Sequence, residues 1–541
     1  MKKSLLTLAF GVSVLCVGQI RPIVANPGGV GSARLDLVEA TVDDLQKANQ
    51  TGLVTIEQLT EMYLTRVAAY DDAGPGVNAF LHVNANAAAQ AAVLDGLRHP
   101  GIARSPLYGI PVLLKDNVDT ADMPTTAGSV ALNGSMPPDD AFITRKLRAA
   151  GAIIIGKGTL TEFANFIALG MPTGYSSLGL FGFNPYDPRP LPGGDGRPVL
   201  QTGGSSSGPG IAVNANLAAV AVGTETSGSI LSPASANGVV GIKPTVGLVS
   251  RDGIIPITAD QDTAGPIART VKDAAILLGV LAGYDPNDPA TAACLSPGNC
   301  FSDYTQFLDK KALLGARIAV PPFPGNRAVI MNAAIDVLRE QGADVQTIPA
   351  LAPQLGTCVS FPPPAGCSTV LMYGQKRDLN KYLAATPGAP MHSLTEIIAF
   401  NSTYVPPMKY GQAIFEAADM LDTSAGSADT LRYLADLVED RARSRGALDA
   451  VYREFDAILA SANSLAATPA KAGYPSITVP GGFLPPDGTI ANPFPSGVTF
   501  SGPAFSEPRL IALAYAFERA TRHRQPPAST PPLPGDTVRR P

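Results

Sequence analysis

Charged side chains are scarce in this sequence, and tryptophan is missing. Asp, Glu, Lys and Arg together make up 16% of the 541 residues, and no tryptophan is present. Because 45 acidic residues outnumber 40 basic ones, the net charge of −5 provides no basic surface for nucleic acid, which we exclude as a partner. A groove that stacks sugars would have to rely on Tyr and Phe. A hydrophobic content of 45% excludes a disordered chain, and 54 Gly with 50 Pro indicate a loop-rich globular fold.

No uninterrupted hydrophobic run is long enough to cross a membrane. Residues 5–18 form an apolar run after Lys2 and Lys3, but a spanning helix needs roughly 20 residues. Two lysines, a short apolar core and small residues up to Ala25 are typical of a secretory signal peptide. We therefore expect residues 1–25 to be a signal peptide, with no stable membrane insertion and with export to the bacterial periplasm or the extracellular space. A buried N-terminal helix is the alternative.

Cysteine is also rare, and its spacing bears on the compartment. Cys16 lies in the expected signal peptide, and the other four form two close pairs in Pro- and Gly-rich segments: Cys294, Cys300, Cys358 and Cys367. In an oxidising compartment, disulfides 294–300 and 358–367 are the simplest of three possible pairings. The rival interpretation, a zinc site with four cysteines, lacks a Cys-x-x-Cys spacing. We expect these cysteines to hold loops together and to take no part in catalysis.

Helical and strand patterns alternate along the rest of the chain. Thr55 and Gln58 form a capping box that begins a helix with apolar residues at helical spacing. An Ala-rich helix is predicted over 84–97, and the apolar run 109–115 predicts a buried strand. Helix and strand patterns continue in residues 145–155 and beyond. This alternation favours an α/β architecture with a large, mostly buried sheet.

We expect one large domain over residues 30–524. Two long irregular stretches, 284–305 and 350–368, would bound a subdomain or form the wall of a site. The sequence shows no internal repeat. The tail, residues 525–541, is polar and rich in proline, so we expect it to be extended and disordered.

Two loops rich in Ser and Gly, residues 203–208 and 223–230, are the strongest candidates for chemistry. The segment between them is long enough for a helix and a strand, which would return the chain to the same end of the sheet. Converging N–H groups in such loops suit an anion or a developing oxyanion. The absence of a lysine after either loop argues against a phosphate-binding loop. Residues 204–208 also fit Gly-x-Ser-x-Gly, but the strand before a nucleophile elbow is missing; flexible linker is the remaining alternative.

None of the histidines is an obvious base for a reactive serine. The four histidines lie in segments without chemical character: His82, His99, His392 and His523. A buried lysine can act as a base, because desolvation disfavours its ammonium form. Lys115 ends the predicted strand 109–115 and precedes Asp116. Spacing alone favours the alternative, a surface ion pair between Lys115 and Asp116.

Four motifs in order resemble the amidase signature family. They are the strand 109–115 with the Asp-Asn that follows, the Gly-Gly-Ser-Ser loop, Gly-Ser-Ile around Ser229, and residues 238–245. The similarity runs from about residue 55 to residue 521, and residues 224–226, 246–256, 261–265 and the late segment 472–482 also match the family. Among family members, the sequence looks most similar to bacterial peptide amidases. The resemblance implies one large α/β domain with a mixed sheet covered by helices, and hydrolysis of a C-terminal peptide amide to a carboxylate and ammonia.

The same resemblance implies roles for individual residues. Ser229 matches the nucleophile, Ser205 the bridging serine after a cis Gly204–Ser205 bond, and Lys115 the base. The oxyanion would be held by backbone N–H groups of Thr226, Ser227, Gly228 and Ser229. No metal and no organic cofactor are implied. We expect a monomer or homodimer that acts on a small-molecule or peptide amide.

Some positions depart from the family pattern and leave the substrate open. Ser227-Gly228 precedes the nucleophile where many members have Gly-Gly, and Leu231 stands where many have Arg. Residues 187–201 look like an insertion that could form a lid or rim. Small aryl, aliphatic or lactam-like amides are therefore an alternative substrate class. Alternatives of other kinds are the ammonia-supplying subunit of a tRNA amidotransferase and an exported protein that binds an anion without chemistry.

Overall fold

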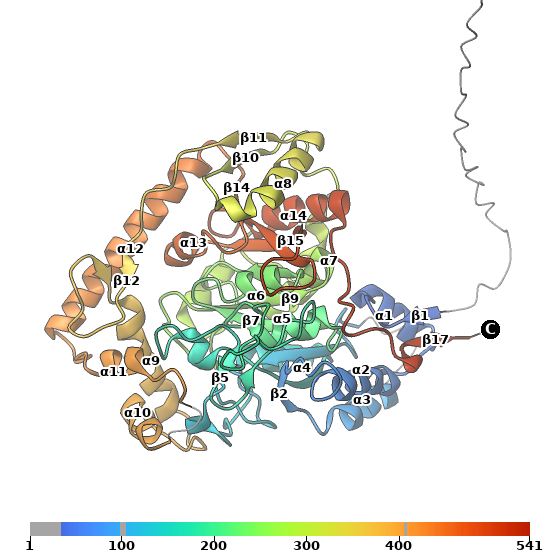
Figure 1. The fold of residues 1–541 in the computed structure, drawn as a ribbon, viewed down its shortest axis with the longest axis horizontal. Coiled ribbons are helices and arrows are strands. Elements are labelled where there is room, and N and C mark those ends of the chain that lie inside the picture. Colours follow the sequence, from blue (N-terminus) through green and yellow to red (C-terminus); the bar gives the residue numbers. More distant parts are fainter. Residues whose placement is uncertain (1–33, 98–103, 405–407, 541) are drawn as a thin grey trace, which may run out of the picture.

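The computed structural model describes residues 34–97, 104–404 and 408–540, coloured along the chain in Figure 1. The expected signal peptide, residues 1–25, lies outside these ranges. None of the helices in the described ranges is long and apolar enough to span a membrane.

One central sheet organises the fold. Within the described ranges it contains eleven strands, in the order β11-β10-β14-β16-β15-β8-β9-β7-β3-β4-β2. β3 pairs in parallel with β4 and β7, and β10 pairs in parallel with β11 and β14, whereas the other pairs are antiparallel. The sheet is therefore mixed, as the family resemblance predicted. Its strands are β2 (Phe80–Val83), β3 (Pro111–Lys115), β4 (Ile153–Gly158), β7 (Val220–Glu225), β8 (Val240–Lys243), β9 (Thr263–Ala268), β10 (Arg317–Val320), β11 (Asp344–Thr347), β14 (Ala457–Ser461), β15 (Ser476–Leu484) and β16 (Phe494–Ser501).

Helices flank this sheet and extend beyond it on one side (Figure 1). Short two-stranded sheets join β1 (Arg34–Asp36) to β17 (Thr537–Arg539), β5 (Tyr175–Ser176) to β6 (Leu180–Phe181), and β12 (Gly356–Thr357) to β13 (Cys367–Ser368). The α-helices are α1 (Val42–Gln50), α2 (Ile56–Tyr70), α3 (Ala87–Gly96), α4 (Phe142–Ala149), α5 (Ser207–Asn214), α6 (Leu231–Ala236), α7 (Val271–Leu281), α8 (Ala328–Glu340), α9 (Val370–Ala384), α10 (Leu394–Thr403), α11 (Ala413–Asp419), α12 (Ala428–Tyr452), α13 (Ala467–Ala472) and α14 (Glu507–Thr521).

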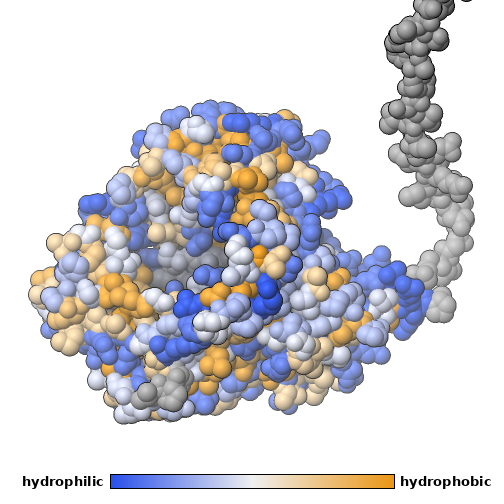
Figure 2. Space-filling view, in the orientation of Figure 1, coloured by the Kyte–Doolittle hydropathy of each residue, from blue (hydrophilic) through white to orange (hydrophobic). Residues whose placement is uncertain are grey.

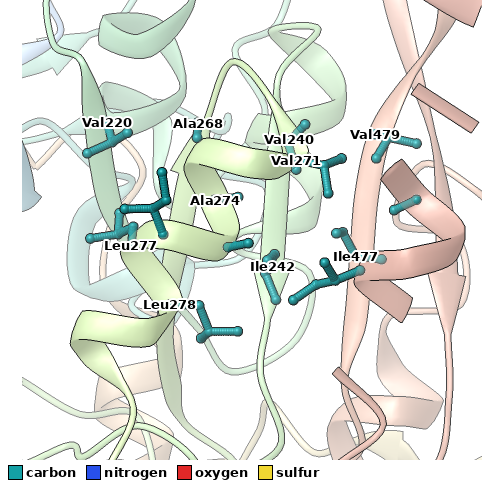
Figure 3. Packing of buried hydrophobic residues seen from close by; sticks show 14 of the residues in the cluster. Val220, Val240, Ile242, Ala268, Val271, Ala274, Leu277, Leu278, Ile477 and Val479 are labelled. Carbon is teal, nitrogen blue, oxygen red and sulfur yellow. The ribbon is translucent and has the colours of Figure 1, made fainter. Parts of the chain in front are cut away.

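The packing of α7 on the sheet illustrates how the core is built. Thr270 caps the helix by accepting a hydrogen bond from the Asp273 N–H. The helix then buries apolar side chains, including Leu277 and Leu278, against strands of the sheet. Figure 3 shows these side chains together with Val220, Val240, Ile242, Ala268, Ile477 and Val479. Removal of this apolar surface from water stabilises the layered fold.

Residues of α9 to α12 and of the segment 127–181 form a second hydrophobic cluster. These helices lie beside the sheet in Figure 1. Members of the cluster include Phe163, which contacts Phe415 edge to face, and Tyr373, which stacks on Tyr433. Tyr373 lies on α9 and Tyr433 on α12, so this stack joins two helices of the cluster. In the space-filling view the surface is hollowed between these helices and the part of the molecule that carries α6 and α13 (Figure 2).

Several predicted local features are confirmed. Helix α2 begins at Ile56 after the capping box of Thr55 and Gln58, and the run before Lys115 forms β3. The four cysteines are paired in the predicted disulfides, Cys294–Cys300 and Cys358–Cys367. This pairing excludes the alternative zinc site, because the sulfur atoms are already bonded to one another.

The prediction of a disordered tail is wrong. Asp536 forms an ion pair with the fully buried Arg66, whose guanidinium also donates to the backbone carbonyls of Thr530 and Pro531. The tail then ends in β17, which pairs with β1. The proline content indicated that the tail could not form a core of its own. A buried arginine needs hydrogen-bond acceptors, however, and because the tail supplies them it is held in place.

The insertion over residues 187–201 also differs from the expected lid or rim. Asp187 accepts from Arg189 and from the Ala491 N–H, while Asp195 accepts from Arg197 and Tyr410. None of its residues lines the cavity beside the second Ser/Gly loop that is described below. The segment is thus fixed to neighbouring loops by its own charged residues.

Candidate active site

The three predicted catalytic side chains come from segments that meet at one edge of the sheet. Lys115 is the last residue of β3, Ser205 lies just before α5, and Ser229 lies between β7 and α6. Because β3 and β7 are parallel neighbours, their carboxyl ends lie side by side. The helix and strand predicted between the two loops are α5 and β7, and they return the chain to this edge.

The Lys115 amine is buried completely and has only uncharged partners. Its Nζ donates to Ser205 Oγ at 2.8 Å, to Thr224 Oγ1 at 2.8 Å and to the Thr224 carbonyl at 3.2 Å. No carboxylate in the described part of the chain accepts a hydrogen bond from it. Asn117 Nδ2 donates to the same Thr224 hydroxyl at 3.0 Å and so helps to orient it.

Burial lowers the pKa of Lys115 from about 10.5 to about 7. Desolvation is the dominant cause, since it disfavours the ammonium, while the charges of Asp262 and Glu225 act in the opposite direction. A neutral amine is therefore well populated near pH 7. A group of this kind can take a proton from a neighbouring hydroxyl.

Asp116 does not pair with Lys115, so the surface ion-pair alternative is wrong. Asp116 accepts from the N–H and hydroxyl of Thr126, and its other oxygen lies 3.4 Å from Nζ of Lys157. Successive side chains at the end of a strand point in opposite directions, which separates Asp116 from Lys115. Both residues are fully buried rather than exposed.

The two loops that carry Ser205 and Ser229 are joined by their backbones. The Ser206 N–H donates to the Ser229 carbonyl at 3.1 Å, and the Gly204–Ser205 bond is cis, as the resemblance predicted. Gly203 has φ +66°, and a Cβ there would lie 2.6 Å from the Ser232 carbonyl, so the close approach requires glycine. Ser205 is fully buried, whereas Ser229 keeps 7% exposure. The bridging hydroxyl is thus fully enclosed together with Lys115, and the expected nucleophile keeps only slight exposure.

The loop around Ser229 is folded around a carboxylate that the sequence did not reveal as part of the site. Glu225 accepts from the N–H groups of Gly228 at 2.6 Å, Ile230 at 2.7 Å and Leu231 at 3.1 Å. A carboxylate at the start of α6 satisfies N–H groups that the helix cannot pair. An acidic residue shortly before a helix start is a signal that could have identified this role.

Glu225 also corrects the predicted set of oxyanion donors. Because the Gly228 N–H is already bound to this carboxylate, it is not free for an oxyanion. The N–H groups of Ser227 and Ser229 donate to no acceptor within the described residues. Thr226 lies in the same turn. Its hydroxyl donates a hydrogen bond to Asp262, and its carbonyl accepts one from Gln261.

A cavity of about 350 Å³ opens beside this loop. Asn117, Thr224, Glu225 and Thr226 form its inner wall. Much of the remaining wall comes from residues within 251–263, from residues 287–289 and from the C-terminal end of α9. The cavity thus adjoins the hydroxyl that binds Lys115 and the first residues of the expected oxyanion loop.

The described histidines lie outside this arrangement. His82 is in β2 at the edge of the sheet, His392 precedes α10 and His523 follows α14. His99 lies outside the described residues. The expectation that histidine does not supply the base is consistent with these positions.

Comparisons with known proteins identify the family of this chain. A family model described as Amidase matches residues 58–511. A probable amidase of Arabidopsis thaliana is 38% identical, over 92% of this chain and 93% of that protein. The crystal structure of a peptide amidase from Stenotrophomonas maltophilia is 40% identical with a TM-score of 0.80, covering 91% of this chain and 99% of that chain. An amidase family protein from Bacillus anthracis is 35% identical with a TM-score of 0.81, covering 91% and 92%. The chain therefore belongs to the amidase signature family and is a hydrolase of carbon–nitrogen bonds.

Proposed function

We propose that this amidase hydrolyses the C-terminal amide of peptides to a carboxylate and ammonia through an acyl-enzyme on Ser229. The observation that carries the proposal is the contact of 2.8 Å between Lys115 Nζ and Ser205 Oγ, in a fully buried environment without a charged acceptor. This contact places a base beside the Ser205 hydroxyl, and the hydrogen bond from the Ser206 N–H to the Ser229 carbonyl holds the two serine loops together. Burial of both groups prevents water from taking over the proton transfer.

Acylation begins when neutral Lys115 accepts the proton of Ser205 while Ser205 takes the proton of Ser229. Ser229 Oγ forms a bond to the amide carbonyl carbon, and the carbonyl π electrons move to its oxygen. The N–H groups of Ser227 and Ser229, with that of Thr226, stabilise the resulting oxyanion.

The proton then returns along the same path to the leaving group. The Lys115 ammonium reprotonates Ser205, which passes a proton to the amide nitrogen as the carbon–nitrogen bond breaks. Ammonia leaves and an ester remains on Ser229. Water attacks this ester with the same base, and the carboxylate product is released.

The substrate class is supported by likeness to solved structures. The peptide amidase from Stenotrophomonas maltophilia shares 40% identity over 91% of this chain. The second Ser/Gly loop adjoins a cavity of about 350 Å³, a size in the range of pockets for small ligands. A panel of peptide amides, anilides and simple carboxamides, assayed for ammonia or amine release, tests the class. Turnover of peptide amides in preference to the other groups supports it, whereas preference for anilides or small carboxamides contradicts it.

The nucleophile is tested separately. Ser229→Ala should abolish turnover and leave the thermal unfolding temperature within a few degrees of the parent. A chromogenic ester should give a burst of product with the parent protein and none with Ser229→Ala. Turnover in the variant would contradict the acyl-enzyme mechanism.

We further propose that the protein is exported. Support comes from the signal-like sequence of residues 1–25 and from the two disulfides, which persist in oxidising compartments. Expression of the full chain in a bacterium, followed by fractionation and N-terminal sequencing, tests this. A processed chain outside the cytoplasm is expected, and an unprocessed cytoplasmic chain would overturn the proposal.

A further inference from the structure

A buried glutamine contacts the expected oxyanion loop from outside the catalytic triad. Gln261 Nε2 donates to the Thr226 carbonyl at 2.8 Å, and the side chain is 4% exposed. The Thr226 carbonyl and the Ser227 N–H belong to the same planar peptide group, in which the two point in opposite directions. A partner that fixes the carbonyl therefore also fixes the direction of the Ser227 N–H.

The next peptide group is fixed from the other side. The Gly228 N–H donates to Glu225 at 2.6 Å, which sets the orientation of the Ser227–Gly228 peptide. Ser227 thus lies between two oriented peptide groups, one held by Gln261 and the other by Glu225. Its own N–H has no acceptor among the described residues, as a donor reserved for an oxyanion requires.

The turn that carries Gln261 is itself anchored on both sides of this residue. Asp260 accepts from Tyr433 at 2.8 Å and from Arg377 at 3.1 Å, which connects the turn to α12 and α9. Asp262 accepts from the N–H groups of Ile257 and Thr258 and from the Thr226 hydroxyl. These contacts hold Gln261 in place without contact to the reacting atoms.

We propose that Gln261 is a positioning residue that aims the Ser227 N–H at the oxyanion. The inference rests on the proposed acyl-enzyme function and adds a residue that acts only through the backbone. Preorganised donors stabilise the transition state because they need no reorientation during the reaction. Loss of the side-chain donor should therefore reduce kcat and leave the KM for a peptide amide nearly unchanged.

The test compares Gln261→Met and Gln261→Glu with a matched control. Methionine keeps the shape of glutamine without an N–H, and a glutamate carboxylate would repel the Thr226 carbonyl. Gln306→Leu is the control, since Gln306 Nε2 donates to the Asp303 carbonyl at 2.6 Å in an exposed turn. Removal of one oxyanion donor costs about 10²–10³ in kcat, so a misaimed donor should cost about ten- to a hundredfold. Each Gln261 variant should show this loss, the glutamate variant the larger one, and Gln306→Leu should show none.

A second measurement separates positioning from a general structural effect. A peptide aldehyde forms a tetrahedral adduct with a serine, whereas the matching peptide alcohol binds without one. In Gln261→Met the affinity for the aldehyde should fall by the same factor as kcat/KM, while that for the alcohol stays constant. If one variant fails to fold, the other is measured alone, because both remove the donor.

A kcat within twofold of the parent, or equal losses for aldehyde and alcohol, would overturn the role of Gln261. That outcome leaves the proposed function intact as long as Ser229→Ala is inactive. Turnover by Ser229→Ala would instead remove the proposed function itself.

Discussion

Lys115 and Lys157 lie on the neighbouring parallel strands β3 and β4, and both are fully buried. Lys157 Nζ lies 3.4 Å from Asp116 Oδ1 and donates to Thr125 Oγ1 at 2.8 Å. Lys115 Nζ contacts two hydroxyl groups and a carbonyl, all uncharged. Burial lowers the pKa of both amines, and carboxylate charges oppose this effect at both, from Asp262 and Glu225 at Lys115 and from Asp116 and Asp119 at Lys157. Of the two lysines, only Lys157 has a carboxylate within 4 Å of its Nζ among the described residues.

The difference shows that burial alone does not produce a base. A buried lysine with a carboxylate partner has its charge compensated, so that loss of the lysine leaves the carboxylate buried without a counter-charge. A buried lysine among neutral hydroxyl groups loses its proton near neutral pH and contributes chemistry. Four substitutions test this division, and they are given in order of decreasing effect.

Replacement of Lys115 by methionine should have the largest effect. Lys115→Met removes the base, so kcat/KM should fall by about a thousandfold or more, within the range for general acid–base groups. Stability at pH 7 should not decrease. With a folded pKa of about 7, the unfolded state binds more protons between pH 7 and 10.5, so the contribution of this amine to stability rises with pH there. In chemical unfolding, the free energy of unfolding should increase less between pH 7 and pH 9 in the variant than in the parent. Substantial residual activity of the variant would contradict the role of Lys115.

Lys157→Met should have the opposite pattern. It leaves Asp116 buried without its counter-charge, and the free energy of unfolding should fall by about 3–5 kcal/mol. Activity per folded molecule should stay within a few fold of the parent. The double variant Lys157→Met with Asp116→Asn should recover part of the lost stability, as denaturant unfolding can measure. A stable but inactive Lys157→Met protein would contradict the division between the two lysines.

Asn117→Asp should make the surroundings of Lys115 resemble those of Lys157. Asn117 and Lys115 contact the same Thr224 hydroxyl, so a carboxylate there would favour the ammonium. The acidic limb of the kcat/KM profile should move from about pH 7 to higher pH by about one to two units. Asn117→Ala removes the same amide without adding charge and should leave the limb in place. If the acidic limb of Asn117→Asp stays at the pH of the parent, a group other than Lys115 determines its position.

Asp262→Asn should produce the smallest change, in the other direction. The charge of Asp262 raises the pKa of Lys115, so its removal should move the limb to lower pH by less than one unit. Asp262 also accepts the Thr226 hydroxyl, so kcat itself is expected to decrease. The position of the limb is therefore the readout, and a movement to higher pH would be inconsistent with this account.

The sequence predicted local features better than contacts between distant segments. The capping box before α2, the strand ending at Lys115 and both disulfides depend on short spacings, and the structure confirms them. The family motifs singled out Lys115, Ser205 and Ser229, and the structure places their three segments at one edge of the sheet. The partner of Asp116 could not be predicted, because Lys157 reaches it only through the pairing of β3 with β4.

Tertiary contacts also account for the expectations that failed. The tail is ordered because Arg66, far away in the chain, requires acceptors that Asp536 and nearby carbonyls provide. Gly228 was predicted to bind the oxyanion, but Glu225 takes its N–H. Composition and family motifs alone do not show which buried donors already have acceptors, although the acidic residue before α6 was a local signal for the role of Glu225.

A direct titration of the Lys115 amine decides whether it is neutral at pH 7. Carbon-13 NMR of protein labelled at lysine Cε, titrated from pH 5 to pH 10, reports each amine, and Lys115→Arg identifies the signal. We expect a Lys115 transition near pH 7 that coincides with the acidic limb of the kcat/KM profile. A Lys115 signal that titrates near pH 10 would show a charged amine at neutral pH and contradict the central claim.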